Sequence, residues 1–363
     1  LTHPTDLFIL FLLVPTLLGD GILITELLIK QFSLLMVILG RITHISFLIK
    51  WLKVKPAQTI ILAFLFAIFV GSLLLSLPVS SVNPEGISFL DAFFTAASAI
   101  CVTGLTTIDI SQEFTRFGQV VILLLVQVGG LGILSFSALL AVFLKKSMSH
   151  KQAMEIQESY AAKNRKQTKE IIKSIFIITF LVEVIGAAVL FIFFNHFSAS
   201  SSDSFFYAIF HSVSAFCNAG FSLFSDSFMT FATASGLIVP ISILIIIGGL
   251  GFPVIFNLMR YLDSRQEYLK LQTKLALSVT LILLVLGTVV FFALEFKNTL
   301  APLSIGNKFL VSFFHSVSAR TAGFNSIDLA TCMPATIIMM LVLMVIGACP
   351  GSTGGGIKTT TFG

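Results

Sequence analysis

The sequence contains little charge for its length. Asp, Glu, Lys and Arg make up 11% of its 363 residues, whereas an average soluble domain has about 25%. Hydrophobic residues make up 56%, and they gather into separate apolar blocks. This balance excludes an ordinary soluble domain. It predicts an all-α integral membrane protein that crosses the lipid bilayer several times.

The chain also has few cysteines, and their spacing carries no motif. The four cysteines form no CxxC pair and no disulfide-framework spacing, which excludes a disulfide-stapled domain. Two histidines, His211 and His315, stand at matching places in two similar stretches, without an acid–base partner beside them. We expect them to pack or to form hydrogen bonds, and we do not expect an enzyme.

One motif occurs three times, at 89–109, 205–226 and 309–328. Each copy begins with an apolar run of about ten residues, which is too short to cross a bilayer, and ends in a turn of small residues. The turns are centred on Gly104, Gly220 and Gly323. A repeat this long indicates several copies of one structural unit.

Longer apolar stretches flank each motif, at 59–77, 119–144, 171–194, 236–259, 275–294 and 333–346. They predict three pore units of span, short helix, turn and second span, at 56–146, 147–262 and 263–363. Residues 1–55 predict an apolar hairpin or irregular segment followed by a basic linker. Small-residue stretches at 127–132 and 248–253 predict close helix packing. Glu183 lies inside a span, where a charge is costly, so we expect it to have an interior partner.

The basic residues favour one side of the membrane. The segments 41–55, 145–173 and 260–274 hold four, eight and four of the 22 Lys and Arg residues, whereas 79–117 and 195–234 hold only Arg116. The positive-inside rule therefore makes the basic loops cytoplasmic, and all three glycine turns enter from outside. The isoelectric point of about 9.0 is explained by these basic loops between the apolar stretches. We therefore expect no nucleic-acid partner.

A turn that re-enters the membrane must line a watery cavity or be buried in protein, because lipid offers its backbone no hydrogen-bond partner. A short helix followed by small residues points several backbone carbonyls at one axis. Rings of carbonyls replace the hydration shell of a monovalent cation, and glycine adopts the dihedral angles that other residues resist. The other interpretation is an ordinary extracellular loop with a glycine turn. Three copies with matching topology count against it.

The motifs AASAICVTGL, HSVSAFCNAGF, HSVSARTAGF and GACPGSTGGGIKTTTF stand at the three turns and near the end of the sequence. They resemble those of the Trk/Ktr/HKT superfamily of potassium transporters, and most of all the membrane, ion-translocating subunits of bacterial Ktr systems. The resemblance covers about residues 56–363. It implies four non-identical pore units placed pseudo-symmetrically around one pore, with the fourth unit expected beyond Gly363.

The resemblance implies a potassium filter whose backbone carbonyls hold K⁺. Its residues are Val102, Thr103, Gly104, Leu105, Asn218, Ala219, Gly220, Phe221, Thr321, Ala322, Gly323 and Phe324. Acids that follow the turns are expected at the outer mouth, where they raise the local cation concentration. They are Asp109, Asp226 and Asp328. Arg320 precedes the third turn, and we expect it to support the filter by bonding carbonyls or a nearby carboxylate. The other interpretation is a plain outer-surface charge.

The glycine-rich stretch at 347–357 is the second informative region. Pro350 and the glycines around it cannot continue the helix at 333–346, so we predict that this helix breaks there. In the resembled families the matching segment is an intramembrane loop that gates the pore. The implied gate residues are Gly347, Pro350, Gly351, Ser352, Thr353, Gly354, Gly355, Gly356 and Lys358. A phosphate loop is disfavoured because an apolar helix precedes the stretch in place of a strand. A kink used only for packing is the other interpretation.

We therefore predict potassium uptake through a channel-like, carbonyl-lined filter. The alternatives are a secondary transporter with broken helices and a midplane cation site, and a non-conducting membrane scaffold. The resemblance also implies a homodimer in the cell (plasma) membrane, with a cytosolic nucleotide-binding regulatory ring subunit on the basic face. Sodium modulates some members, nucleotide acts only through the regulatory partner, and no covalent cofactor is expected.

Overall fold

The computed structural model describes residues 56–132, 165–197, 200–263 and 268–362. The chain divides into two compact parts, Leu1–Leu62 and Ala63–Gly363, and the description below concerns the second. The predictions for 1–55 and for most of the basic segment 145–173 lie outside the described residues.

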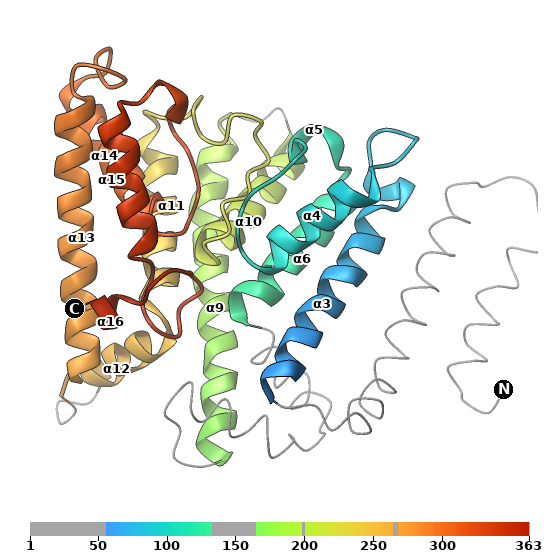
Figure 1. Cartoon of the computed structure of the whole chain (residues 1–363), viewed down its shortest axis with the longest axis horizontal. Helices are drawn as coiled ribbons and strands as arrows, with labels where there is room; N and C mark the ends of the chain where they lie inside the picture. The colour runs from blue at the N-terminus through green and yellow to red at the C-terminus, as the bar shows by residue number, and fades with distance from the viewer. Residues whose placement is uncertain (1–55, 133–164, 198–199, 264–267, 363) are drawn as a thin grey trace, which may run out of the picture. The chain divides into compact units, whose positions relative to one another are not determined.

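Helices dominate the described part of the chain (Figure 1), and β-pairing there is limited to two isolated bridges, Ser81 with Phe114 and Ile346 with Ile357. The helices are α3 (Pro56–Leu75), α4 (Phe89–Ile100), α5 (Ile110–Glu113), α6 (Arg116–Leu131), α9 (Arg165–Phe194), α10 (Ser201–Phe216), α11 (Ser235–Leu250), α12 (Phe252–Asp263), α13 (Leu271–Glu295), α14 (Ile305–Ser318), α15 (Pro334–Val345) and α16 (Thr359–Phe362). Two short 3₁₀ helices, η2 (Pro78–Ser80) and η3 (Leu329–Thr331), lie between them.

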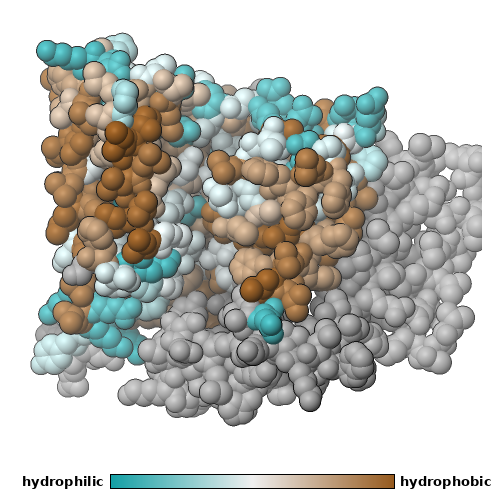
Figure 2. All heavy atoms as spheres, in the orientation of Figure 1, coloured by the Kyte–Doolittle hydropathy of each residue, from teal (hydrophilic) through white to brown (hydrophobic). Residues whose placement is uncertain are grey.

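Among the residues that the structure describes, two helices are long and apolar enough to cross a membrane by themselves, namely α9 over Glu170–Phe194 and the whole of α13. Their outer faces carry large apolar side chains such as Phe180, which is 70% exposed, and Leu281, which is 63% exposed. Figure 2 shows apolar side chains gathered over α13 and α15, and again over α4 and α6, with hydrophilic side chains at the rims. Lipid is the solvent that suits such a surface. The predicted all-α membrane fold is confirmed.

The predicted span at 236–259 is not one straight helix, because the structure bends it. α11 ends at Leu250, α12 begins at Phe252, and the two helices meet at 96°. Gly251 between them has φ +81°, a conformation that costs other residues free energy. Pro253 follows in the first turn of α12, where its missing N–H is tolerated. Sequence reasoning treated this stretch as helix packing alone and missed the bend.

Gly251→Ala should therefore destabilise the protein. A Cβ at this position would lie 2.5 Å from the carbonyl oxygen of Pro350, and the left-handed conformation alone costs alanine about 1–2 kcal/mol. We expect a lower temperature of thermal unfolding in detergent. Gly249→Ala is the matched control, since its Cβ would make only ordinary contacts, the nearest at 3.6 Å. Equal melting temperatures for the two variants would contradict this account of the bend.

The three short helices pack in the same way. α4 contacts α6, α10 contacts α9 and α11, and α14 contacts α13 and α11. In each case a glycine of a longer helix lets the short helix approach closely: a Cβ on Gly186 would lie 2.5 Å from Ser212 Oγ, and one on Gly287 would overlap Ser316 Oγ. Gly71 faces Ala96 in the same manner. A glycine of the preceding longer helix thus faces each of α4, α10 and α14.

The second helix of the first repeat is shorter in the structure than the predicted 119–144. α6 begins at Arg116, capped by the Thr115 side chain, and ends at Leu131, where Gly132 has φ +79°. Residues 133–144 of the predicted span lie outside the described residues. The close packing predicted for 127–132 is present: a Cβ on Gly129 would overlap the carbonyl oxygen of Ile100, the last residue of α4.

Candidate functional site

The three glycine turns, at 102–105, 218–221 and 321–324, come together in the structure. A Cβ added to Gly104 would overlap the carbonyl oxygen of Ala219, and one added to Gly220 would overlap that of Ala322. A Cβ on Gly323 would lie 3.7 Å from the Cα of Gly220. Each turn therefore lies against the next, backbone to backbone, and a side chain at Gly104 or Gly220 would displace a neighbouring carbonyl.

The turns share one backbone conformation. Gly104, Gly220 and Gly323 have φ of +77°, +72° and +83°. The residue two positions before each glycine also has positive φ, namely Val102 (+54°), Asn218 (+56°) and Thr321 (+77°). β-branched residues rarely adopt this conformation, so strain at Val102 and Thr321 is held by the surrounding fold. The three turns therefore share positive φ at two positions that are separated by one residue.

The connection from the short helix to the turn is one residue shorter in the third repeat than in the second. Ser214 Oγ donates to the carbonyl of Phe221 at 2.7 Å, and Ser318 Oγ donates to that of Phe324 at 2.5 Å. The separations are seven and six residues. The sequence places Gly220 nine residues after His211 but Gly323 only eight residues after His315, and this difference is absorbed between helix and turn. The conformation around each glycine is unaffected by it.

Each short helix directs its C-terminal end at a turn. α4 ends at Ile100, α10 at Phe216 and α14 at Ser318, and the first turn residues follow directly. The C-terminus of a helix carries about half a negative charge, because its last carbonyls lack partners within the helix. Three such ends aimed at one place favour a cation there.

His211 and His315 hold the chain just after the glycines, in the hydrogen-bonding role expected for them. His211 Nε2 lies 3.2 Å from Ser222 Oγ and accepts from the backbone N–H of Leu223 at 3.2 Å. His315 Nε2 lies 3.1 Å from Ser326 Oγ. Both rings stack on phenylalanines, His211 on Phe224 and His315 on Phe291. These contacts fix the outward continuation of the second and third turns.

A cavity of about 360 Å³ lies on the side of the turns that follows the glycines. It is lined by all three glycines and by polar residues that include Thr106, Asp109, Ser225 and Asn325. Of the three acids assigned to an outer mouth, Asp109 lines this cavity. Asp226 instead accepts the N–H of Thr230 at 2.8 Å, and Asp328 accepts that of Ala330 at 2.9 Å, so both are engaged in local turns.

Asp109 keeps its negative charge at neutral pH. Partial burial acts to raise the pKa of its carboxyl group, but hydrogen bonds from the side chains of Ser111 and Ser225 and from the N–H groups of Ser111 and Gln112 outweigh burial. The net pKa is lower than the ordinary value. The cavity therefore contains a fixed anionic group beside three backbone turns.

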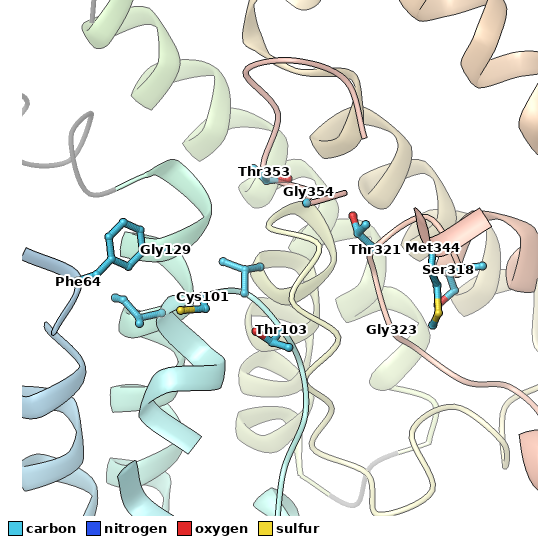
Figure 3. Close-up of a pocket in the computed structure, with 14 residues that line it drawn as sticks. Phe64, Cys101, Thr103, Gly129, Ser318, Thr321, Gly323, Met344, Thr353 and Gly354 are labelled. Carbon is cyan, nitrogen blue, oxygen red and sulfur yellow. The ribbon is translucent and has the colours of Figure 1, made fainter. Parts of the chain in front are cut away.

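A second cavity, of about 410 Å³, lies on the side that precedes the glycines. The turns contribute Val102, Thr103, Thr321 and Gly323, and Cys101 lies beside them. The residues 353–355 of the glycine-rich loop complete the lining. Figure 3 shows Thr353 and Gly354 on the loop and Thr321, Gly323, Cys101 and Thr103 on the turns around this space. Gly323 lines both cavities, so the third turn adjoins both.

The glycine-rich loop, residues 347–358, interrupts the helix at the predicted place. α15 ends at Val345, and the short α16 begins only at Thr359. Main-chain bonds hold the loop against the bend between α11 and α12: Cys349 N donates to Gly249 O at 2.9 Å, and Phe252 N donates to Gly351 O at 3.0 Å. Lys358 Nζ donates to Gly354 O at 2.8 Å within the loop. The loop is thus a folded element docked beside the turns.

Arg320 connects the third turn to this loop. Its side chain is 8% exposed, and Nη2 donates to Gly347 O at 3.3 Å and to Thr280 Oγ1 at 3.4 Å. One of these partners is a backbone carbonyl, as expected, but it belongs to the glycine-rich loop. Burial also argues against a plain surface charge. The reason is the direction of the side chain, which leaves the turn and runs behind it to α13 and the loop.

A family model for the cation transport protein TrkH matches residues 32–363. The chain belongs to this family. It is 40% identical over 316 residues to the Ktr system potassium uptake protein B of Bacillus subtilis, a match that covers 86% of this chain and 70% of that protein. It is 41% identical over 310 residues to the protein of the same name in Vibrio alginolyticus, covering 84% and 67%.

The fold agrees with a solved TrkH-family structure. The crystal structure of the potassium transporter TrkH from Vibrio parahaemolyticus matches 99% of this chain and 71% of that one, with a TM-score of 0.64 at 21% identity. The resemblance to the Trk/Ktr superfamily noted from the motifs is confirmed. TrkH-family proteins are cation transport proteins, so this chain is a membrane transporter and not an enzyme.

Sequence reasoning missed one contact in this TrkH-family chain that joins the loop to the second turn. The side-chain amide of Asn218 lies 3.0 Å from Thr353 Oγ1, and the same hydroxyl donates to the carbonyl of Phe216 at 3.0 Å. The signal was present as two glycine-rich stretches, 248–251 and 347–356, since glycines at both allow two backbones to approach closely. Nothing in either stretch alone identified the other as its partner.

Arg320→Gln should loosen the loop and lower stability. A buried hydrogen bond from a charged donor contributes about 1.5–3 kcal/mol, and the variant leaves Gly347 O without this donor. We expect a clearly lower melting temperature in detergent. Arg116→Gln is the control: Arg116 pairs with Asp203, but both side chains are 46% exposed, and exposed pairs contribute about 0–1 kcal/mol. A variant of Arg320 as stable as that of Arg116 would refute the connecting role.

Proposed function

We propose that this chain takes up potassium by letting K⁺ pass along its electrochemical gradient through a filter to which the three glycine turns contribute. The observation that carries the proposal is the direct contact of the turns, with the carbonyls of Ala219 and Ala322 packed against the neighbouring glycines. Backbone oxygens at such a ring replace the hydration shell of a monovalent cation. The names of the Ktr relatives, which are potassium uptake proteins, support the choice of ion.

The surroundings of the ring support the same function. The ends of α4, α10 and α14 and the carboxylate of Asp109 are negative, which attracts a cation from the outer cavity. Filter residues are those assigned above, with Gly104, Gly220 and Gly323 at their centre. The pore units at 56–146, 147–262 and 263–363 are then arranged pseudo-symmetrically around one axis. The basic segments face the cytoplasm and the filter is entered from outside, across the cell membrane.

We further propose that residues 347–358 gate the pore. Residues 353–355 line the inner cavity beside the turns, where they stand in the way of an ion that leaves the ring. The relatives are named as parts of Ktr systems, which supports a cytosolic regulatory partner and a homodimer for this chain also. Such a partner would bind the nucleotide, and sodium would act as a modulator.

Reconstituted protein tests the function directly. In liposomes with a potassium gradient, the protein should carry rubidium inward without coupling to proton or sodium movement, and sodium alone should pass poorly. A flux that requires a second ion in fixed ratio would favour the alternative, a secondary transporter, for which the bend at Gly251 and the break after Val345 are suitable features. No rubidium flux from a folded, fully assembled preparation would reject the proposal.

A further inference from the structure

The second repeat contains a buried carboxyl group, that of Glu183, at a position where the other two repeats have an apolar residue. Ser212 Oγ donates to the backbone carbonyl of Glu183 at 2.7 Å, and Ser316 Oγ donates to that of Leu284 at 2.9 Å. Three residues later, Gly186 and Gly287 each face the same serine. Glu183 and Leu284 therefore occupy matching places in α9 and α13.

The first repeat also has an apolar residue at this place. Gly71 of α3 faces Ala96 of α4, and three residues before it stands Ile68, which is 7% exposed. Two of the three repeats thus pack this position with a hydrocarbon side chain. A buried carboxyl group costs free energy in such surroundings, so its presence in the second repeat calls for a local reason.

The partner of Glu183 is a second polar exception. Glu183 is 7% exposed; its Oε2 accepts from Gln127 Nε2 at 3.2 Å, and its Oε1 has no hydrogen-bond partner. Gln127 stands two residues before Gly129, which abuts the last carbonyl of α4. The corresponding glycine, Gly248, abuts the last carbonyl of α10, and two residues before it stands Ile246. Within the described residues, this Gln127–Glu183 pair lies where α6 meets α9.

The hydrogen bonds of Glu183 and Gln127 extend to the start of the second turn. Cys217 Sγ donates to Gln127 Oε1 at 3.8 Å, a weak bond of the kind thiols make. Cys217 is the C-cap residue of α10 and directly precedes Asn218, the residue with φ +56° at which the turn begins. A Cβ on Gly130 would lie 2.6 Å from Cys217 Sγ, so α6 presses on the same residue.

We propose that Glu183 is a positioning residue that determines ion specificity: through Gln127 it fixes Cys217 and so the direction of the carbonyls in the second turn. The inference rests on the proposed filter function. The side-chain amide of Gln127 can take two orientations. Because Glu183 accepts a hydrogen bond from Nε2, the amide is held with Nε2 toward α9 and Oε1 toward Cys217. Selectivity depends on the number and field of the coordinating carbonyls, and functional geometry tolerates about 0.5 Å of error.

The test compares rubidium and sodium flux in liposomes that contain the complete protein. Glu183→Leu and Gln127→Leu should each lower the rubidium-to-sodium flux ratio about threefold or more, because the carbonyls lose their fixed direction. Glu183→Gln should keep a ratio near that of the wild type, because its amide oxygen still accepts from Gln127. The double leucine variant should be no worse than either single variant, since both act on one path.

A merely structural role would change the amount of folded protein and leave the ratio as it was. Leu284→Met is the matched control, a volume-conserving change at the equivalent place in α13, and should leave the ratio unchanged. If Glu183→Leu does not fold, Gln127→Leu carries the test, since Ile246 shows that the matching position accepts an apolar residue. Folded leucine variants with the wild-type ratio would overturn the inference, provided that Gly220→Ser alters it. If Gly220→Ser also has no effect, the filter itself is refuted.

Discussion

We expect Gly220→Ser to remove most of the discrimination between potassium and sodium. A Cβ at this position would overlap the carbonyl oxygen of Ala322 in the next turn, and under the proposed function that oxygen is one of the ion's ligands. Serine also resists the φ of +72° found there, at a cost of about 1–2 kcal/mol. The turns must then move apart or tilt. Their carbonyls no longer compensate K⁺ for its lost hydration shell better than they compensate Na⁺.

The expected size is a fall of about tenfold or more in the rubidium-to-sodium flux ratio, which corresponds to about 1.4 kcal/mol. Total cation flux should persist, because a distorted ring still offers carbonyls. Gly306→Ala is the control: its Cβ would meet nothing within 4 Å, and alanine is a better helix former than glycine. An unchanged ratio for Gly220→Ser in folded protein would mean that the second turn does not select the ion.

Deleting residues 353–355 should raise the resting flux several-fold. These residues line the cavity of about 410 Å³ beside Thr321 and Gly323, whereas the base of the loop is held separately by the bonds Gly347 N to Ile357 O and Ile357 N to Val345 O. The deletion thus shortens the tip and removes the contacts of Thr353, while the bonds at the base of the loop remain. Rubidium efflux from loaded liposomes, without any regulatory partner, measures the effect.

The control for the deletion is Thr353→Ser, which keeps the hydroxyl that bonds Phe216 O. It should leave the resting flux near that of the wild type. Thr353→Val removes the hydroxyl and should lie between the control and the deletion, because the tip then loses about 0.5–1.5 kcal/mol of its docking to α10. Deletion without any rise in flux would assign the loop to packing alone.

Much of the local structure was predictable from residue type. The short helices α4, α10 and α14 end where small residues and glycine follow, and α15 stops before Pro350 and its glycines, because those residues cannot continue a helix. The meeting of the three turns followed from their matching topology. These features depend on a few neighbouring residues, which a sequence displays directly.

Contacts between distant segments were much harder to predict. Arg320 was expected to bond near its own turn, but a side chain of that length also reaches α13 and Gly347. The bend at Gly251 was read as close packing, because a glycine within an apolar run serves either purpose. Only the neighbouring Pro350 carbonyl, which fills the space a Cβ would need, decides between them. Apolar periodicity identifies which face of a helix is buried, but it does not identify the segment that packs against this face.

The attachment of the glycine-rich loop to the bend at Gly251 sets an energetic threshold for moving it. Three of its anchors are peptide groups: Cys349 N to Gly249 O, Thr353 N to Gly248 O and Phe252 N to Gly351 O. Withdrawing the loop leaves these buried donors and acceptors without hydrogen-bond partners. The free-energy cost is about 1–3 kcal/mol for each unpaired group. No side-chain substitution can erase that threshold. Under the proposed gating role, any force that opens the pore has to supply this free energy, or has to move the bend between α11 and α12 together with the loop.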